Sequence, residues 1–324
     1  MPIAAYSWVM RSALVTGGRG FIGRHLVEAL VQRGVDVKTI GRTTSNDMNH
    51  FALSSNAWDS PALDRILEDA APDCIFHLAG QSRGTAEELE HANVSLMHSI
   101  LRSLRRTGLR PRLLIAGSAA EYGAAIRDGE PICETAVCAP LSPYGTSKHA
   151  QTRAALAFAD ATGIPVLVAR IFNALGPQMP VHLAIGDFAK QIASIPGDHG
   201  VLHVGNIDVS RDFIDVEHIA TLLCQLAEKA DAQGIVNICS GQASPLRYLV
   251  DLLIYGCGRK IDVEIDWTRV RGNEPRVIVG SIDLLTKLGC PPPPTDLPEV
   301  MARVCRSLDK IRRGHGRAVW KSGV

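Results

Sequence analysis

The first half of the chain alternates short apolar runs with longer amphipathic segments of helical period. This alternation is typical of parallel strands joined by helical crossovers, because such strands are buried on both faces. It predicts an α/β fold with a doubly wound parallel sheet. The expected strands are Ala13–Thr16, Val35–Ile40, Cys74–Leu78, Arg112–Ala116 and Pro165–Ile171.

After Asn173 the alternation gives way to loops rich in glycine and proline, with helices near 188–195, 216–229 and 245–255. The run Ile235–Ile238 has the character of a strand that returns to the main sheet. We therefore predict a smaller second lobe, partly interleaved with the first domain. The expected divisions are an N-terminal extension (1–10), the first domain (11–173), a region that is mainly second lobe (174–311, with the return strand near 235–239) and a basic tail (312–324).

Composition narrows the class of protein. The 324 residues are 46% hydrophobic, enough for one large or two unequal domains, and a net charge of +1 gives no general attraction to nucleic acid. The eight cysteines are dispersed without the spacing typical of a zinc site, so we predict free thiols and no metal. No apolar run reaches the roughly 18 residues of a membrane span, and no signal peptide is evident. We expect a cytoplasmic protein with no membrane partner.

Two motifs carry candidate chemistry. The first, Gly17-Gly-Arg-Gly-Phe-Ile-Gly23, follows an apolar run and opens an amphipathic segment, which is the strand, turn and helix that a dinucleotide pyrophosphate needs. The second is the pair Tyr144 and Lys148, one turn apart on a helix that Ser142 would cap and Pro143 would begin. The lysine charge and the helix N-terminus are expected to lower the tyrosine pKa, so that the phenol can transfer a proton.

With Ser118 ahead of Tyr122-Gly123, these motifs resemble the extended short-chain dehydrogenase/reductase family, of the NAD-dependent epimerase/dehydratase type. The likeness runs through 77–80, Asn93, 170–173 and 211–213, and covers nearly the whole chain. It implies a Rossmann-type NAD(P)-binding domain, a smaller α/β substrate-binding lobe and a nucleotide-diphosphate sugar as ligand. It also implies a homodimer, paired through the helix of Tyr144 and the helix near Asn93.

The resemblance further implies roles for individual residues. Ser118 would hold the reacting sugar oxygen, Tyr144 would supply the proton, and Lys148 would bind the nicotinamide ribose. The implied cofactor-binding residues are Gly17, Arg19, Gly20, Phe21, Ile22, Gly23, Arg42, Asn56, Ala57, Leu78, Ala79, Gly80, Asn93, Tyr144, Lys148 and Ile171. The implied substrate-binding residues are Gln81, Ser82, Ser118, Asn173, Arg211 and Arg271.

The end of the second strand bears on the choice of cofactor. In this fold an acid there binds the ribose hydroxyls of NAD, and an arginine suits the 2′-phosphate of NADP. Gly41 stands where the acid would be and Arg42 follows it, so NADPH is favoured, with NAD as the alternative.

The reaction class follows from the same comparison. The 4,6-dehydratases of the family place an acid where this chain has Ala120. Glu121 is acidic but follows that position by one residue, so its side chain is expected to point away from the site or to contact substrate. A reductase is therefore the leading class.

Three segments, at 81–82, 204–216 and 237–241, resemble the GDP-4-keto-6-deoxy-D-mannose reductases more than UDP-sugar epimerases, which implies GDP-D-rhamnose or GDP-6-deoxytalose as product. The alternatives are a UDP- or dTDP-sugar 4-epimerase that retains NAD and, less favoured, a non-catalytic nucleotide-binding protein. His182 and His203 are weaker candidates for a second acid or base.

Overall fold

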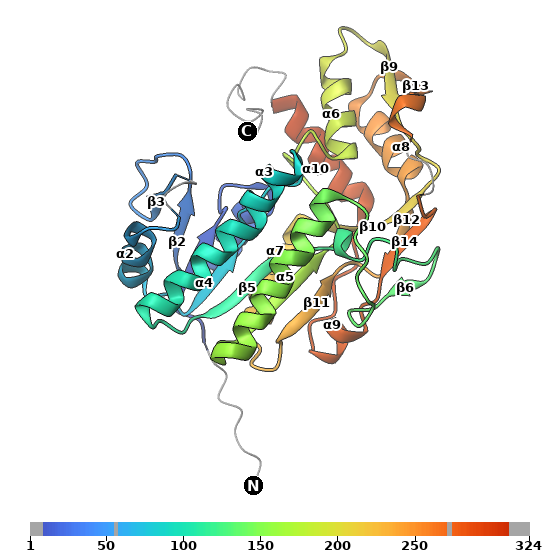
Figure 1. Cartoon of the computed structure of the whole chain (residues 1–324). Helices are drawn as coiled ribbons and strands as arrows, with labels where there is room; N and C mark the ends of the chain where they lie inside the picture. Colours follow the sequence, from blue (N-terminus) through green and yellow to red (C-terminus); the bar gives the residue numbers. More distant parts are fainter. Residues whose placement is uncertain (1–8, 55–57, 271–273, 311–324) are drawn as a thin grey trace.

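The computed structural model describes residues 9–54, 58–270 and 274–310. Its main feature is a parallel sheet of seven strands in the order β11-β7-β5-β4-β1-β2-β3, covered by helices on both faces (Figure 1). The predicted doubly wound fold is confirmed. In chain order the strands are β1 (Ser12–Thr16), β2 (Asp36–Gly41), β3 (His50–Ala52), β4 (Cys74–His77), β5 (Arg112–Ser118), β7 (Val166–Ile171) and β11 (Gly234–Ile238).

Each face of the sheet has its own hydrophobic core because successive strand residues point to opposite sides. In β1, Ala13 and Val15 pack toward α1 (Phe21–Gln32) and α7 (Val216–Ala227). Leu14 packs toward the other layer, which holds α2 (Pro61–Ala70), α4 (Leu96–Thr107) and α5 (Pro143–Thr162). The side chain of Met10, the last residue of the expected N-terminal extension, is buried in the first of these cores.

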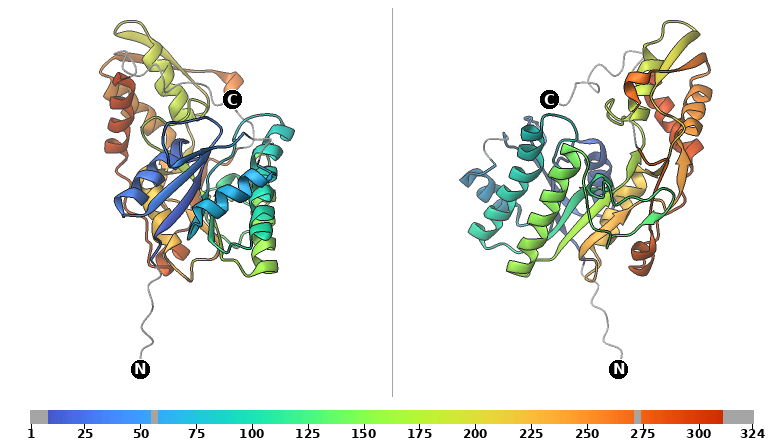
Figure 2. Two further views of the ribbon diagram at one scale, coloured as in Figure 1. Left: turned by 90° about the vertical axis from the view of Figure 1, so that its left-hand side faces the viewer. Right: turned by 45° about the vertical axis from the view of Figure 1, so that its right-hand side comes forward.

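The second lobe stands above the carboxyl ends of the main strands (Figure 2). Its mixed sheet contains β6 (Pro131–Ile132), β8 (Asn173–Leu175), β10 (Ser210–Asp215), β12 (Ala243–Pro245) and β14 (Val277–Gly280). A separate pair, β9 (His199–Val204) and β13 (Lys260–Ile265), packs with the helices α6 (Ala184–Ser194), α8 (Leu246–Cys257) and α10 (Leu297–Lys310) around one core. Shorter elements are α3 (Ala86–Glu90), α9 (Asp283–Lys287) and the single turns η2 (His91–Ser95), η3 (Ala119–Glu121) and η4 (Trp267–Arg269).

The two lobes are interleaved along the chain. After β8, α6, β9 and β10 have built part of the second lobe, α7 and β11 return to the main domain, where β11 pairs with β7 in parallel. No helix in the described part of the chain combines the length and hydrophobicity that a membrane span needs. The predicted basic tail, 312–324, lies outside the described residues.

Candidate active site

The sequence motifs meet at one edge of the main sheet. Because its strands are parallel, the carboxyl ends of β1, β2, β4, β5 and β7 lie together, and the chain crosses from one face to the other between β1 and β4. The segments that follow these ends contain most of the residues predicted to bind cofactor. This edge is therefore the candidate site.

The turn after β1 is shaped for close approach of a ligand. Gly17 has φ +71°, and a β-carbon there would lie 2.7 Å from the backbone nitrogen of Ala79, so only glycine lets the turn pack on the segment after β4. Helix α1 begins at Phe21, and its N-cap, Gly20, supplies no side-chain hydrogen bond. The first N–H groups of α1 can therefore bind an anion, and this cradle fits a dinucleotide pyrophosphate.

The end of β2 is basic and rich in hydroxyl groups. The Arg19 guanidinium reaches across from the glycine turn and donates to Thr43 Oγ1 at 3.0 Å and to Ser45 Oγ at 2.7 Å. Arg42 is exposed beside them. The imidazole of His50 is hydrogen bonded to Thr39 Oγ1 (2.7 Å) and to the Thr43 carbonyl (2.9 Å), and thus fixes this loop. Asn56 and Ala57, the other predicted contacts for the adenosine half, lie outside the described residues.

Helix α5 brings the predicted catalytic residues together. Ser142 caps it by accepting a hydrogen bond from the Gly145 N–H at 3.0 Å, and Pro143 is its first residue, as predicted. A β-carbon on Gly145 would lie 2.4 Å from the Ala120 carbonyl oxygen, so a larger residue would force α5 away from η3. This close packing sets Tyr144 beside Ser118, whose hydroxyl favours the ionised form of the phenol.

The expected lowering of the Tyr144 pKa is wrong for this structure. Burial raises the pKa of the phenol, the neighbouring Ser118 hydroxyl opposes this, and the charge of Glu121 raises it further. The ammonium of Lys148 instead donates to the side-chain carbonyl of Gln151. Lys148 is itself buried, and burial lowers its pKa to about 8 against the opposing effect of Glu121.

Asn93 stabilises the loop after β4. It lies in η2, a turn of π-helix, and is fully buried. Its Oδ1 accepts from the Gln81 N–H, while its Nδ2 donates to the Gln81 carbonyl and to Ser147 Oγ, all at 2.9 Å. Asn93 therefore joins the 78–81 segment to α5, and a π-turn inside a helical stretch is often found at a functional site. Its role in cofactor binding stays a prediction that would act through this loop.

A buried ion pair behind the site was not foreseen. Arg170 Nε and Glu121 Oε2 are 3.1 Å apart, with side chains 2% and 0% exposed. Glu121 also accepts from the Ser118 N–H at 2.8 Å and from Thr152 Oγ1 at 2.9 Å. It thus points away from the edge and links η3, α5 and β7. The only signal in the sequence is an arginine inside the otherwise apolar run of β7, which requires a buried partner.

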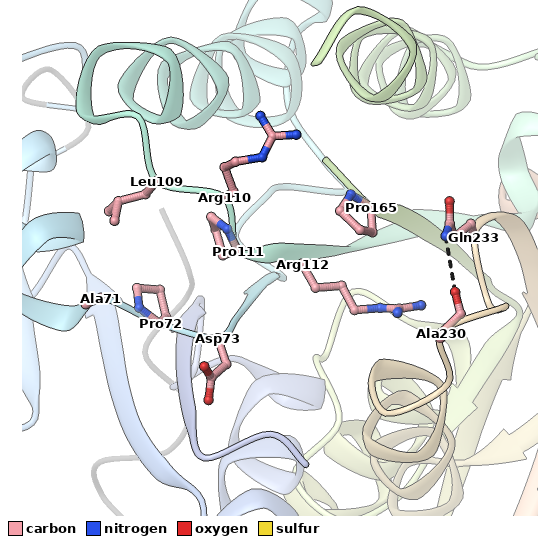
Figure 3. Close-up of a pocket in the computed structure, with 10 residues that line it drawn as sticks. All are labelled: Ala71, Pro72, Asp73, Leu109, Arg110, Pro111, Arg112, Pro165, Ala230 and Gln233. Carbon is pink, nitrogen blue, oxygen red and sulfur yellow. Dashed lines mark hydrogen bonds between the residues drawn. The ribbon is translucent and has the colours of Figure 1, made fainter. Parts of the chain in front are cut away.

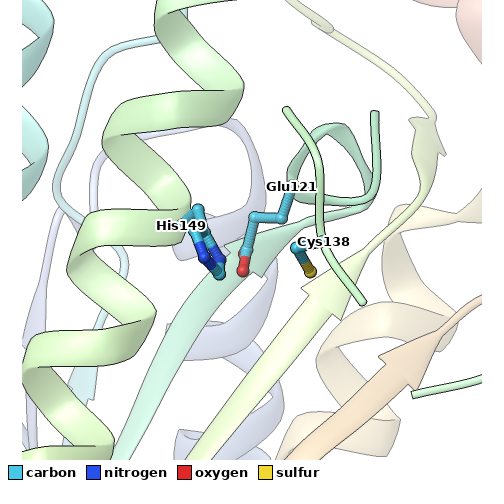
Figure 4. Close-up of side chains that lie close together, drawn as sticks. All are labelled: Glu121, Cys138 and His149. Atoms are coloured by element: carbon cyan, nitrogen blue, oxygen red, sulfur yellow. The ribbon is translucent and has the colours of Figure 1, made fainter. Parts of the chain in front are cut away.

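Glu121 also lies near a cysteine and a histidine (Figure 4). Ligand atoms of Glu121, Cys138 and His149 fall within 4.8 Å of one another. Both carboxylate oxygens already accept hydrogen bonds, and the Arg170 guanidinium sits against them. A cation would have to displace that guanidinium, so the cluster fits a structural ion pair better than a metal centre.

The predicted substrate-binding residues differ in how available their side chains are to a ligand. Ser82 Oγ is hydrogen bonded to His182 Nε2 at 2.8 Å, a contact between the two lobes. Asn173 is exposed, and its Nδ2 donates to the Asp212 carbonyl at 2.9 Å. Arg211, by contrast, is buried in an ion pair with Glu274, at 2.6 Å, so a diphosphate would have to compete with that carboxylate. Arg271 lies outside the described residues, and His203 is exposed on β9.

A cavity of about 550 Å³ lies at the opposite, amino-terminal edge of the sheet (Figure 3). Its polar groups are largely occupied: Asp73 accepts from the N–H groups of Arg11 and Ser12, and Arg112 donates to the Ala232 carbonyl. None of the predicted site residues lines it. We therefore place the candidate site at the carboxyl edge and not here. The lining residues are Ala71, Pro72, Asp73, Leu109, Arg110, Pro111, Arg112, Pro165, Ala230 and Gln233.

Comparison with known proteins agrees with this geometry. The chain is 31% identical over 275 residues to a GDP-6-deoxy-D-mannose reductase of Pseudomonas aeruginosa, which covers 82% of this chain and 87% of the relative. It is 30% identical over 250 residues to a dTDP-6-deoxy-L-talose 4-dehydrogenase (NAD(P)(+)) of Kitasatospora kifunensis, covering 75% and 78%. A solved structure described as RMD from Pseudomonas aeruginosa complexed with NADPH superposes with a TM-score of 0.79 at 27% identity, over 93% of this chain and 99% of that one.

The family model described as "NAD dependent epimerase/dehydratase family" matches residues 13–239, which include the glycine turn, Ser118, Tyr144 and Lys148. The match spans most of the chain and includes every main-sheet strand except the first residue of β1. Such enzymes are NAD(P)-dependent oxidoreductases and epimerases that act on nucleotide sugars. The chain belongs to the NAD-dependent epimerase/dehydratase family, within the extended short-chain dehydrogenases/reductases.

Proposed function

We propose that this enzyme uses NADPH to reduce the C4 ketone of a nucleotide-activated 4-keto-6-deoxy sugar, with GDP-4-keto-6-deoxy-D-mannose as the first substrate to test. The observation that carries the proposal is the end of β2, where Gly41 stands in place of the acid and Arg19 donates to Thr43 and Ser45 beside Arg42. This environment suits the 2′-phosphate of NADPH. Because NADPH is consumed as a reductant, a site for it favours a reductase. The names of the relatives that act on 6-deoxy sugars support the choice of sugar.

The residues at the edge suit the reducing direction. Ser118 and Tyr144 lie beside each other and can bind one carbonyl oxygen together. A tyrosine phenol, with an ordinary pKa near 10, is protonated at neutral pH, and burial raises the pKa of Tyr144 further. It can therefore donate its proton to that oxygen as the ketone becomes an alcohol. NADPH, when bound, would supply the hydride. Glu121 holds Ser118 in place by accepting a hydrogen bond from the Ser118 backbone N–H.

The direct test is NADPH oxidation with GDP-4-keto-6-deoxy-D-mannose generated in situ, run beside NADH and beside the UDP- and dTDP-linked keto sugars. We expect turnover with NADPH and the GDP sugar, and NMR of the product then distinguishes GDP-D-rhamnose from GDP-6-deoxytalose. Purified protein that carries tightly bound NAD and interconverts UDP-hexoses would instead establish the epimerase. The homodimer stays a prediction, for which light scattering is the measurement.

We predict that Arg19→Ala selectively weakens binding of NADPH. Loss of charge-assisted hydrogen bonds to the 2′-phosphate is expected to raise the Kd for NADPH about tenfold to a hundredfold, with little change for NADH. Fluorescence titration of both cofactors measures this. Arg247→Ala, which removes an exposed arginine paired with Asp208 on the second lobe, is the control and should leave both constants unchanged. An equal loss for the two cofactors would place Arg19 at the pyrophosphate that they share.

A further inference from the structure

The surroundings of Lys148 contain one residue with no assigned role. Gln151 lies one turn further along α5 and is 1% exposed, and its Oε1 accepts a hydrogen bond from the Lys148 ammonium. No other hydrogen bond and no ion pair of Lys148 is found among the described residues. A buried cation of this kind is held by a neutral amide instead of a carboxylate, which is a weak partner for a charge out of contact with water.

Buried polar and charged groups surround the contact between Gln151 and Lys148. Its own Nε2 is buried without a hydrogen-bond partner in the described structure, and so is Nε2 of His77 at the end of β4. His77 is neutral, because burial and the charge of Lys148 lower its pKa to about 3. The other charged group that acts on Lys148 is Glu121 of η3, with Arg170 of β7 behind it. Tyr144 precedes Lys148 by about one turn on the same helix.

We propose that Gln151 is a positioning residue for Lys148: its side-chain carbonyl fixes the buried ammonium at one place on α5 and helps to keep it charged beside the reacting phenol. The hydrogen bond between the two side chains carries the argument, and the spacing allows it, since residues three apart on a helix lie on the same face. The kinetic consequence of this proposal rests on the proposed reductase function. The contact between the two side chains is independent of that function.

Two substitutions of similar size should have opposite effects. Gln151→Glu places a carboxylate at the same distance and is expected to raise the Lys148 pKa by about one unit or more. Gln151→Leu removes the acceptor, leaves the burial and should lower that pKa below its present value of about 8. The charged form of Lys148 is lost as pH rises through its pKa. The alkaline limit of turnover should therefore move to higher pH in Gln151→Glu and to lower pH in Gln151→Leu.

The decisive measurement needs neither substrate nor cofactor. Protein labelled with ¹³C at the lysine ε-carbon is titrated by NMR, with Lys148→Met to assign the signal and thermal unfolding to check that each variant is folded. Opposite shifts of the Lys148 titration in the two variants support the proposal, even if no keto sugar is reduced. Unchanged titrations, or shifts in the same direction, would overturn it. Should Gln151→Leu fail to fold, a Gln151→Glu titration equal to that of the parent is sufficient to reject it.

Discussion

The Tyr144→Phe enzyme is expected to turn over about a hundredfold to ten-thousandfold more slowly than the parent, because it lacks the proton that the reduced oxygen must receive. Phenylalanine keeps the aromatic ring and removes only the hydroxyl, so the loss should appear in kcat. The Kd for NADPH should change little, because the glycine turn and the end of β2 are untouched. Steady-state kinetics and cofactor titration on the same preparation measure the two quantities.

Tyr255→Phe is a matched control, since Tyr255 is 87% exposed on α8 and far along the chain from the site. It should keep the kinetics of the parent. If Tyr144→Phe kept them as well, the phenol would have no part in proton transfer, and Ser118 or a bound water would have to supply the proton. A Ser118→Ala variant would then decide between those two donors.

The frame of the site was predictable because local rules fix it. Ser142 and Pro143 mark the first turn of α5 by capping chemistry alone. The glycine turn lies between an apolar strand and a helix, which is the local arrangement that binds an anion at a helix N-terminus. Parallel pairing then brings all the strand ends to one edge without further information. Three strands of the second lobe, β6, β8 and β12, escaped prediction because they are only two or three residues long, too short for any period to show. The six-residue strands β9, β10 and β13 were missed as well, although their length would let a period show.

The electrostatics of the site were not predictable in the same way. A spacing of four places Tyr144 and Lys148 on one helical face, yet it does not say which neighbour the lysine side chain chooses or how deeply the phenol is buried. Those depend on contacts from η3 and β4, which are remote in sequence. The pKa of Tyr144 consequently moves in the direction opposite to that expected from its neighbours along the helix. Local sequence gives proximity, and tertiary packing gives the sign of the shift.

The buried pair of Arg170 and Glu121 should govern stability more than any surface charge. We expect Arg170→Met to lower the free energy of unfolding by about 3–5 kcal/mol, because it leaves the Glu121 carboxylate buried without its ion-pair partner and with the Ser118 N–H and Thr152 as its remaining hydrogen-bond donors. The guanidinium also lies 4.6 Å from the centre of the Tyr122 ring, a contact that the substitution weakens. Urea unfolding of the full chain, followed by circular dichroism, measures the change.

The double variant Glu121→Gln with Arg170→Met separates the cost of an unpaired charge from the cost of lost packing. Replacing both charges removes the unpaired carboxylate, so the double variant should be more stable than Arg170→Met alone. Arg127→Met, which breaks an exposed pair with Glu130, serves as the control and should cost less than about 1 kcal/mol. A double variant no more stable than Arg170→Met would mean that the arginine stabilises the fold through its contacts with Tyr122 and its neighbours, and that its charge is incidental.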